Sequence, residues 1–281
     1  MPHAHRATRL LARVAVVSLI GLTVVGVTDA VRAEAVAAVG GAGAVAAAGS
    51  APAGRAMWVW DTSTPAATVD LAVARGISQL YAAVPPQVQS SPKLAELTDL
   101  SHRAAAAGIR VDALGGDPGW VDNQAWVVDQ WLRPALATGL FRGIHVDIEP
   151  YTTAAWQTQR AKVVKKYLAT YDTLAAAAGQ TPVEADIPFW FDEIPANGST
   201  LDREVMRRTD GVAVMAYRNL ASGPDGTIAL ASKEVAAGAA LGVPSRLVSW
   251  PMRTGTPRAA PAATSLEARA IVPSGPLARL R

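Results

Sequence analysis

Three polar side chains alternate with apolar ones in the segment Gly143–Pro150. Because side chains of a strand alternate between its two faces, this spacing puts His145, Asp147 and Glu149 on one face. A carboxylate two residues from another on the same face can raise its neighbour's pKa, as a general acid requires. Buried carboxylates are costly unless paired, and no Lys or Arg is adjacent on that face. The pattern favours an acid–base site, and the alternative is a buried polar network that only stabilises the fold.

Short apolar segments that predict strands recur along the chain, separated by amphipathic stretches with the punctuation of helices. Thr64 and Ser91, each followed by Pro, indicate helix starts, and Gly179 indicates a helix end. The spacing from strand to strand is about 20 to 40 residues, which suits βα units. The predicted strands are Met57–Asp61, Ile77–Val84, Ile109–Leu114, Gly143–Glu149, Val183–Trp190, Gly211–Tyr217 and Arg246–Trp250.

This repeat predicts an α/β fold, a (β/α)₈ TIM-like barrel whose eighth βα unit is missing or degenerate. The alternative is an open doubly wound sheet, but its Gly-rich phosphate loop is absent after the first strand, since Trp60–Ser63 contains no glycine. In a barrel the apolar face of segment 143–149 meets the helices and the polar face points inward. Glu149 then lies at the carboxyl end of its strand, where barrel enzymes place catalytic groups.

The composition of the sequence divides the chain into four regions. Residues 1–33 predict a signal peptide, with basic residues before an apolar run, and cleavage after Ala33 would give a secreted or extracytoplasmic protein with no stable membrane insertion. The alternative is a retained membrane anchor. Residues 34–56 are an Ala/Gly-rich linker, residues 57–250 the barrel domain, and residues 251–281 an Arg/Pro/Ala-rich tail that we predict to be disordered. A frameshift and a native tail are both compatible with that composition.

Composition excludes several classes of function. The 281 residues are 50% hydrophobic and 17% charged, too apolar for a disordered protein. There is no cysteine, and only His102 and His145 lie outside the signal peptide, so we expect neither a metal nor a cofactor. Five Arg against two acids in residues 1–56, and five Arg against one acid in 251–281, leave sixteen basic and twenty acidic residues between. This mildly acidic core argues against nucleic-acid binding.

Residues 142–149 resemble the fourth-strand motif of the chitinase-like family 18 glycoside hydrolases, D-G-x-D-x-D-x-E. This chain reads R-G-I-H-V-D-I-E, so the glycine, the last Asp and the Glu match, while Arg142 and His145 replace the first two Asp. Two further similarities occur in order. Ala113–Gly116 stands where the family has S-x-G-G on strand three, and Met215–Tyr217 where it has M-x-Y on strand six.

The resemblance implies roles for three residues. Glu149 would be the general acid that protonates the glycosidic oxygen, and Asp147 would orient the substrate's 2-acetamido group, itself the nucleophile of a substrate-assisted route. Tyr217 would donate a hydrogen bond to the acetamido carbonyl. Arg218 follows Tyr217 where the family usually has Asp or Asn, so this departure and His145 imply altered specificity or lost activity.

Other polar and aromatic residues are candidates for substrate binding. Asp186 shares a strand face with Glu184, and the alternative is that it caps a local turn. Tryptophans at strand ends suit a carbohydrate groove, because sugar rings stack on aromatic faces. Trp126 and Trp131 are interpreted as helix packing. The predicted substrate-binding residues are Asp186, His145, Trp60, Asp61, Trp120, Trp190 and Arg218.

We therefore expect a secreted glycoside hydrolase that acts on an N-acetylhexosamine polysaccharide, with a carbohydrate polymer as its partner. A two-carboxylate retaining enzyme needs a nucleophile about 5 Å from the acid. No carboxylate lies near Trp250 on the seventh strand, so this route requires Asp186. The alternative from another class is a non-catalytic, lectin-like barrel. Glu149 favours the enzyme, since a lectin has no need of an acid.

Overall fold

The computed structural model describes residues 54–218 and 220–248, which contain one sheet of seven parallel strands. Its order is β1-β2-β3-β4-β5-β8-β9, so each strand lies beside its predecessor in this sheet. A doubly wound sheet would reverse its order part-way, so this topology is that of a partial (β/α) barrel, as the sequence predicts. The strands are β1 (Arg55–Val59), β2 (Ile77–Ala83), β3 (Arg110–Gly115), β4 (Ile144–Val146), β5 (Val183–Pro188), β8 (Gly211–Met215) and β9 (Ser245–Val248).

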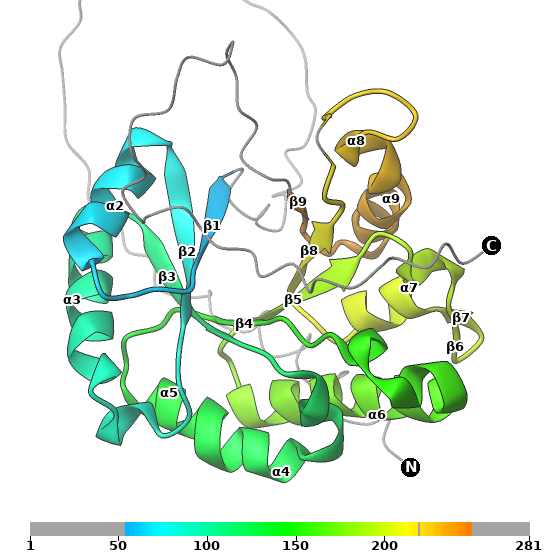
Figure 1. Ribbon diagram of the computed structural model, residues 1–281, viewed down its shortest axis with the longest axis horizontal. Coiled ribbons are helices and arrows are strands. Elements are labelled where there is room, and N and C mark those ends of the chain that lie inside the picture. The colour runs from blue at the N-terminus through cyan, green and yellow to red at the C-terminus, as the bar shows by residue number, and fades with distance from the viewer. Residues whose placement is uncertain (1–53, 219, 249–281) are drawn as a thin grey trace, which may run out of the picture. The chain divides into compact units, whose positions relative to one another are not determined.

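Helical segments connect the strands and lie on the outer side of the sheet (Figure 1). A small antiparallel hairpin, β6 (Pro195–Ala196) with β7 (Ser199–Thr200), is separate from the main sheet. The helices are α2 (Pro65–Ala74), α3 (Lys93–Ala106), α4 (Gln124–Trp126), α5 (Arg133–Ala137), α6 (Ala154–Ala178), α7 (Leu201–Met206), α8 (Thr227–Leu230) and α9 (Ser232–Leu241). Shorter helical turns are η1 (Val88–Ser90), η2 (Pro118–Asp122), η3 (Val127–Leu132), η4 (Pro150–Thr152) and η5 (Phe191–Glu193).

The alternation along each strand explains why helices cover one face of the sheet. Side chains on the outer face are apolar and buried, which gives the helices a continuous surface to pack on. Helix α2 begins at Pro65, where a missing N–H costs nothing, and α6 ends before Gly179, whose φ of 64° is unfavourable for other residues. The buried outer-face residues are Leu80, Ala82, Val111, Ala113, Ile144, Val146, Ala185, Ile187, Val212 and Val214.

The sheet is curled, because side chains from its two ends meet across the inner face. Arg246 on β9 donates hydrogen bonds to the hydroxyl of Tyr81 (3.1 Å) and the amide oxygen of Gln79 (2.8 Å), both on β2. Trp58 on β1 packs against Met215 of β8 and Val248 of β9. Polar inner-face residues of β2, β5 and β9 therefore converge in the interior.

Strand ends differ from the sequence-based prediction, and two of the differences bear on the site or on the domain boundary. Strand β4 ends at Val146 rather than Glu149, because the chain leaves the ladder and turns into η4 at Pro150. Strand β1 begins at Arg55, inside the segment that composition assigns to the linker. The predicted signal peptide, most of the linker, the end of the seventh predicted strand at Trp250 and the predicted tail lie outside the described residues.

Within the described ranges, no helix combines the length and apolar character needed to cross a bilayer.

Candidate active site

An ion-pair network surrounds Glu184 in the interior, near the amino end of β5. Its Oε2 accepts hydrogen bonds from the Tyr81 hydroxyl (2.9 Å) and Nη1 of Arg246 (2.9 Å). On β3, Nε of Arg110 pairs with Oδ1 of the fully buried Asp112 at 2.7 Å. Burial opposes ionisation of Glu184, but contact with His145 and the charge of Arg246 hold its pKa at about 2. Glu184 is therefore a permanent anion beneath the site.

His145 on β4 lies above this network and is completely buried. Its Nδ1 is 3.6 Å from Oε2 of Glu184, and its Nε2 is 3.1 Å from Oδ2 of Asp186. The ring of Tyr81 stacks on the imidazole with centroids 3.6 Å apart. Burial alone would lower the pKa of His145, but Asp186 and Glu184 together raise it to about 9. His145 is thus an imidazolium ion between two carboxylates. The sequence analysis predicts that His145 binds substrate, but the residue is completely buried, so a substrate cannot contact it directly.

Asp147 and Glu149 follow β4 at its carboxyl end, and Gly115 and Gly116 at the end of β3 pack against the backbone of Asp147. The N–H of Asp147 donates to the carbonyl of Gly115 at 2.9 Å. A Cβ on Gly116 would lie 1.9 Å from the carbonyl oxygen of Asp147, so only glycine fits there. This close approach gives the Gly-Gly pair of the sequence a structural reason, because it fixes the segment that carries the two carboxylates.

The carboxyl group of Asp147 has an unusual environment. Burial, followed by the negative charges of Asp186 and Glu149, raises its pKa to about 8, against the opposing effect of His145. Tyr217 follows β8 and keeps 42% of its surface exposed, yet partial burial and the charges of Asp186, Asp147 and Glu149 raise the pKa of its hydroxyl. The structure therefore brings His145, Asp147, Glu149, Asp186 and Tyr217 within range of one another's charge. At neutral pH Asp147 carries a proton.

Glu149 is half-buried beside an aromatic cluster. Its Oε1 accepts a hydrogen bond from the hydroxyl of Tyr151, two residues further along the chain. The ring of Tyr151 in turn lies edge-on to Trp190, with centroids 5.2 Å apart, and close to Phe191. Trp190 is therefore half-buried as part of the support for Tyr151. The aromatic cluster sets the orientation of the Glu149 carboxyl group.

A cavity of about 720 Å³ opens at the carboxyl ends of β1 to β3, and neither Asp147 nor Glu149 is among the residues that line it. Four tryptophans line it, and Gly116 joins its wall to the backbone of Asp147. Trp60 is 53% exposed and Trp126 is 47% exposed, whereas Trp120 and Trp131 are buried with centroids 4.8 Å apart. The helix-packing interpretation is right for Trp131, whose Nε1 donates to the carbonyl of Val84 at 2.9 Å. It is wrong for Trp126, which faces the cavity.

Two other predicted substrate-binding residues, Asp61 and Arg218, are not among the residues that line this cavity. The carboxylate of Asp61 accepts the N–H of Ser63 at 2.9 Å, and this hydrogen bonding lowers the pKa of Asp61. Arg218 is exposed, with its guanidinium carbon 5.3 Å from the ring centroid of Phe189 and its Nη1 donating to the carbonyl of Tyr217. Both side chains have local structural partners.

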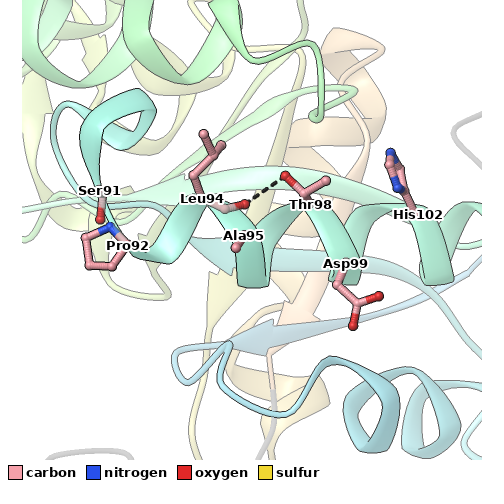
Figure 2. A pocket seen from close by; sticks show the side chains of 7 residues that line it. All are labelled: Ser91, Pro92, Leu94, Ala95, Thr98, Asp99 and His102. Carbon is pink, nitrogen blue, oxygen red and sulfur yellow. Dashed lines mark hydrogen bonds between the residues drawn. The ribbon is translucent and has the colours of Figure 1, made fainter.

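Among residues 54–218 and 220–248, no group of three or more His, Asp and Glu side chains is arranged to hold a metal ion. A second hollow of about 660 Å³ lies over helix α3 and is lined from Ser91 to His102 (Figure 2). Figure 2 shows the hydroxyl of Thr98 bonded back to the carbonyl of Leu94 within that helix, at 2.7 Å. None of the predicted site residues lines this hollow.

Sequence reasoning missed the residues that support the carboxylates. Trp58 on β1 contacts Asp186, and Tyr81 on β2 stacks on His145. Glu184 on β5 accepts hydrogen bonds from Tyr81 and from Arg246 on β9. The available signal was polar alternation on the inner face of neighbouring strands, as in Gln79 and Tyr81. Alternation cannot show which strands lie opposite each other across the interior.

No protein-family model matches the chain, and no curated protein matches it. The chain is similar in fold to family 18 chitinases. The GH18 chitinase of Cycas revoluta is 18% identical with a TM-score of 0.44, over 70% of this chain and 68% of that one. The class V chitinase of Nicotiana tobaccum is 16% identical with a TM-score of 0.44, over 70% and 65% of the two chains. The Bacillus megaterium spore cortex-lytic enzyme SleL is 14% identical with a TM-score of 0.47, over 71% of this chain and 51% of SleL. Similarity at this level leaves the chemistry of the site to this chain's own residues.

Proposed function

We propose that this protein is a secreted hydrolase of glycosidic bonds in N-acetylhexosamine polysaccharides. The observation that carries the proposal is the pair Asp147 and Glu149 on one short segment after β4. Gly116, which packs against the backbone of Asp147, also lines a cavity with the exposed Trp60 and Trp126. Tryptophan faces bind sugar rings, and the neighbouring carboxyl groups are acid–base catalysts of the kind that glycoside hydrolysis needs.

In this proposal Glu149 donates its proton to the glycosidic oxygen while the bond from that oxygen to the anomeric carbon breaks. The carbonyl oxygen of the 2-acetamido group forms the new bond to the anomeric carbon. Glu149, now a carboxylate, then takes a proton from the water that attacks the same carbon and opens the ring formed by the acetamido group. Glu149 regains its proton, and no protein nucleophile is consumed.

Asp147 and Tyr217 hold the acetamido group in this scheme. The hydroxyl of the half-exposed Tyr217 donates a hydrogen bond to the acetamido carbonyl, and Asp147 orients the acetamido N–H. The raised pKa of Asp147 keeps the charge beside Glu149 low at neutral pH. A direct double-displacement route is less suited, because Asp186 is buried and held by Trp58 and His145.

The test is release of a chromophore from aryl N-acetylglucosaminide oligomers, together with binding of the same sugars. Glu149→Gln removes the proton donor but keeps its shape, so turnover should fall by about 10² to 10⁴-fold while binding is nearly unchanged. Asp147→Asn should slow N-acetylated substrates more than non-acetylated ones. The exposed Glu193 gives a matched control, Glu193→Gln, with parental rates. Equal rates in parent and Glu149→Gln would reject the enzyme.

The second candidate is a lectin-like protein that binds the same sugars without cleaving them. The exposed tryptophans of the cavity favour it, since stacking on Trp60 and Trp126 needs no acid. Binding in the parent and both variants, with no turnover in any of them, would select this function.

Secretion is part of the proposal and has its own test. Amino-terminal sequencing of protein recovered from the culture medium should give a start near Glu34. A start at Met1 or Pro2 would exclude cleavage of the signal peptide.

A further inference from the structure

Segment η3 (Val127–Leu132) is a π-helix inside a helical run that continues from α4 into α5. At its end the N–H of Arg133 donates to the carbonyl of Val128, five residues earlier, whereas an α-helix would use the residue four positions earlier. The turn therefore accommodates one extra residue. Short π-helical turns inside α-helices are rare and are found frequently at functional sites, so this one calls for a cause and an effect.

Pro134, directly after the π-helix, supplies the cause. Proline has no backbone N–H, so position 134 cannot donate to the carbonyl of Gln130, and in a regular α-helix its ring would collide with that carbonyl. A wider turn before Pro134 relieves the collision. The carbonyl of Gln130 instead accepts a hydrogen bond from the N–H of Gln87, at 2.6 Å.

Gln87, in the loop after β2, is also joined to η3 by its side chain. Its Nε2 donates to Oε1 of Gln130, and its φ of 50° lies in the left-handed region, which is unfavourable for a residue with a side chain. Close by, Nε1 of Trp131 donates to the carbonyl of Val84 at 2.9 Å. Strained backbone of this kind persists only where its surroundings fix it, and here three hydrogen bonds to η3 do so.

The π-helix changes which side chains share a face. Residues five apart lie about 140° apart around the axis of an α-helix, but in a π-helix they are hydrogen-bonded along the axis and lie on one side. Trp126 and Trp131 are five apart, and both line the cavity at the carboxyl ends of β1 to β3. Trp131 is buried against Gly115, and Trp126 presents an exposed face. An α-helical turn would direct Trp126 away from the cavity.

We propose that Pro134 and Gln87 are positioning residues that keep η3 π-helical, and that the wider turn places Trp126 on the cavity wall as a stacking face. Stacking of a sugar ring on that face rests on the proposed function. Pro134 removes the α-helical alternative, and Gln87 binds the carbonyl that this alternative would need. The turn therefore acts on sugar affinity through the direction of Trp126.

The first test is Pro134→Ala in the full chain. Alanine restores the N–H and removes the ring, so in a crystal structure the N–H of Arg133 should bond to Asp129 instead of Val128. Calorimetric titration with the tetramer of N-acetylglucosamine should show affinity about twofold to tenfold below the parent's, the loss expected for one stacking face. Pro65→Ala in the first turn of α2 is the matched control, because no helical bond is missing there. It should leave the affinity unchanged.

The second test is a rescue, in which Asp129 is deleted from Pro134→Ala. The deletion leaves Trp126 and Trp131 four positions apart, a spacing that puts both on one face of an α-helix. Asp129 is exposed and pairs only with Arg133 on the surface among the described residues, so its loss should cost little stability. Affinity for the tetramer should return to the parental value. A variant that is weak for reasons of stability alone would not be repaired by a second change in the same helix.

An Arg133 N–H that still bonds to Val128 in Pro134→Ala would overturn the positioning role, and so would a deletion that fails to restore affinity. Should Pro134→Ala fail to fold, Gln87→Gly decides. Glycine adopts a positive φ freely, so this variant loses only the side-chain bond to Gln130, and its affinity should fall by less. Parental affinity in Gln87→Gly would then reject the proposal.

The positioning role and the proposed function fail separately. If the parent binds no N-acetylglucosamine oligomer, the proposed function is wrong, and the acceptor of the Arg133 N–H in Pro134→Ala still decides whether Pro134 holds the π-helix. If the parent binds and cleaves the oligomers but η3 keeps its π-helical bond in Pro134→Ala, the hydrolase stands and the positioning role is rejected.

Discussion

The hydroxyl of Tyr151 donates a hydrogen bond to the carboxylate of Glu149, two residues earlier in the chain. Helical turn η4 makes this contact possible, because Pro150 bends the chain directly after the acid. Trp190 and Phe191 hold the ring of Tyr151 in place. The proposed proton donor is therefore oriented by a residue of its own segment.

Tyr151→Phe should lower kcat about fivefold to tenfold with little change in KM. The variant keeps the aromatic packing but removes one hydrogen bond, worth about 1 kcal/mol, that orients Glu149. Steady-state kinetics on an aryl N-acetylglucosaminide measure this, with Tyr171→Phe on α6 as a control that also deletes a buried hydroxyl. A change confined to KM would contradict the orienting role.

Gly116→Ala should destabilise the protein by about 1 to 3 kcal/mol and reduce turnover as well. The added methyl group would collide with the backbone carbonyl of Asp147, which cannot move without shifting both carboxylates. Chemical denaturation and kinetics measure the two effects. Gly119→Ala is the control from the same loop, because its Cβ meets only the end of the Asp117 side chain at 3.0 Å. Equal stability of the two variants would contradict the close approach.

Alkaline pH should unfold the protein through His145. The pKa of His145 is about 9 in the folded state against 6.5 in an unfolded chain, so its contribution is complete below pH 6.5 and is lost as pH rises through 9. Asp147 has a raised pKa of about 8, so the stability that it contributes to the folded protein is also lost as pH rises from 3.8 to 8. Denaturant unfolding of Asp147→Asn isolates the histidine. A flat unfolding free energy between pH 6.5 and 9 in that variant would contradict a charged His145.

Glu234 on α9 gives an independent pH dependence outside the site. Its side chain is fully buried, neither carboxylate oxygen has a hydrogen-bond partner among the described residues, and burial with the charges of Asp192 and Asp202 raises its pKa to about 7. The stability that it contributes is complete below pH 4.5 and is lost as pH rises through 7. Glu234→Gln should remove this part of the pH dependence of unfolding. A variant whose stability falls as steeply as the parent's across that range would show that Glu234 titrates normally.

Trp126→Ala should weaken binding of N-acetylglucosamine oligomers without loss of stability. Trp126 is 47% exposed at the cavity, and loss of its stacking face should cost about 0.5 to 1.5 kcal/mol of binding. Trp131→Ala is the contrasting variant, since that side chain is 1% exposed and its removal should cost about 3 to 5 kcal/mol of stability. Calorimetric titration and thermal unfolding separate the two. Unchanged affinity in Trp126→Ala would exclude this wall of the cavity from sugar binding.

Local pattern was enough to predict the parts of the fold that depend on neighbours in sequence. The alternation in Gly143–Pro150 correctly predicts that His145 and Asp147 point inward, and the seven predicted strands all occur, with shifted ends. The pattern could not predict that His145 would be sealed from solvent, because Tyr81 stacks on it from a strand 64 positions earlier. Nor could the pattern predict that Arg246 pairs with Glu184. Such pairings depend on how the sheet curls, which no strand encodes by itself.

The hydrogen bonds that Arg246 makes across the interior have a consequence for the order in which the domain folds. Arg246 joins Glu184, 62 positions earlier, to Tyr81 and Gln79, 165 and 167 positions earlier. Contacts of such large sequence separation form late, since closing the intervening chain costs entropy before any contact rewards it. As a nascent chain leaves the ribosome, Glu184 emerges before the guanidinium of Arg246 that pairs with it. Docking of β9 is then the step that gives Glu184 its arginine partner and joins the last described strand to the second strand across the interior.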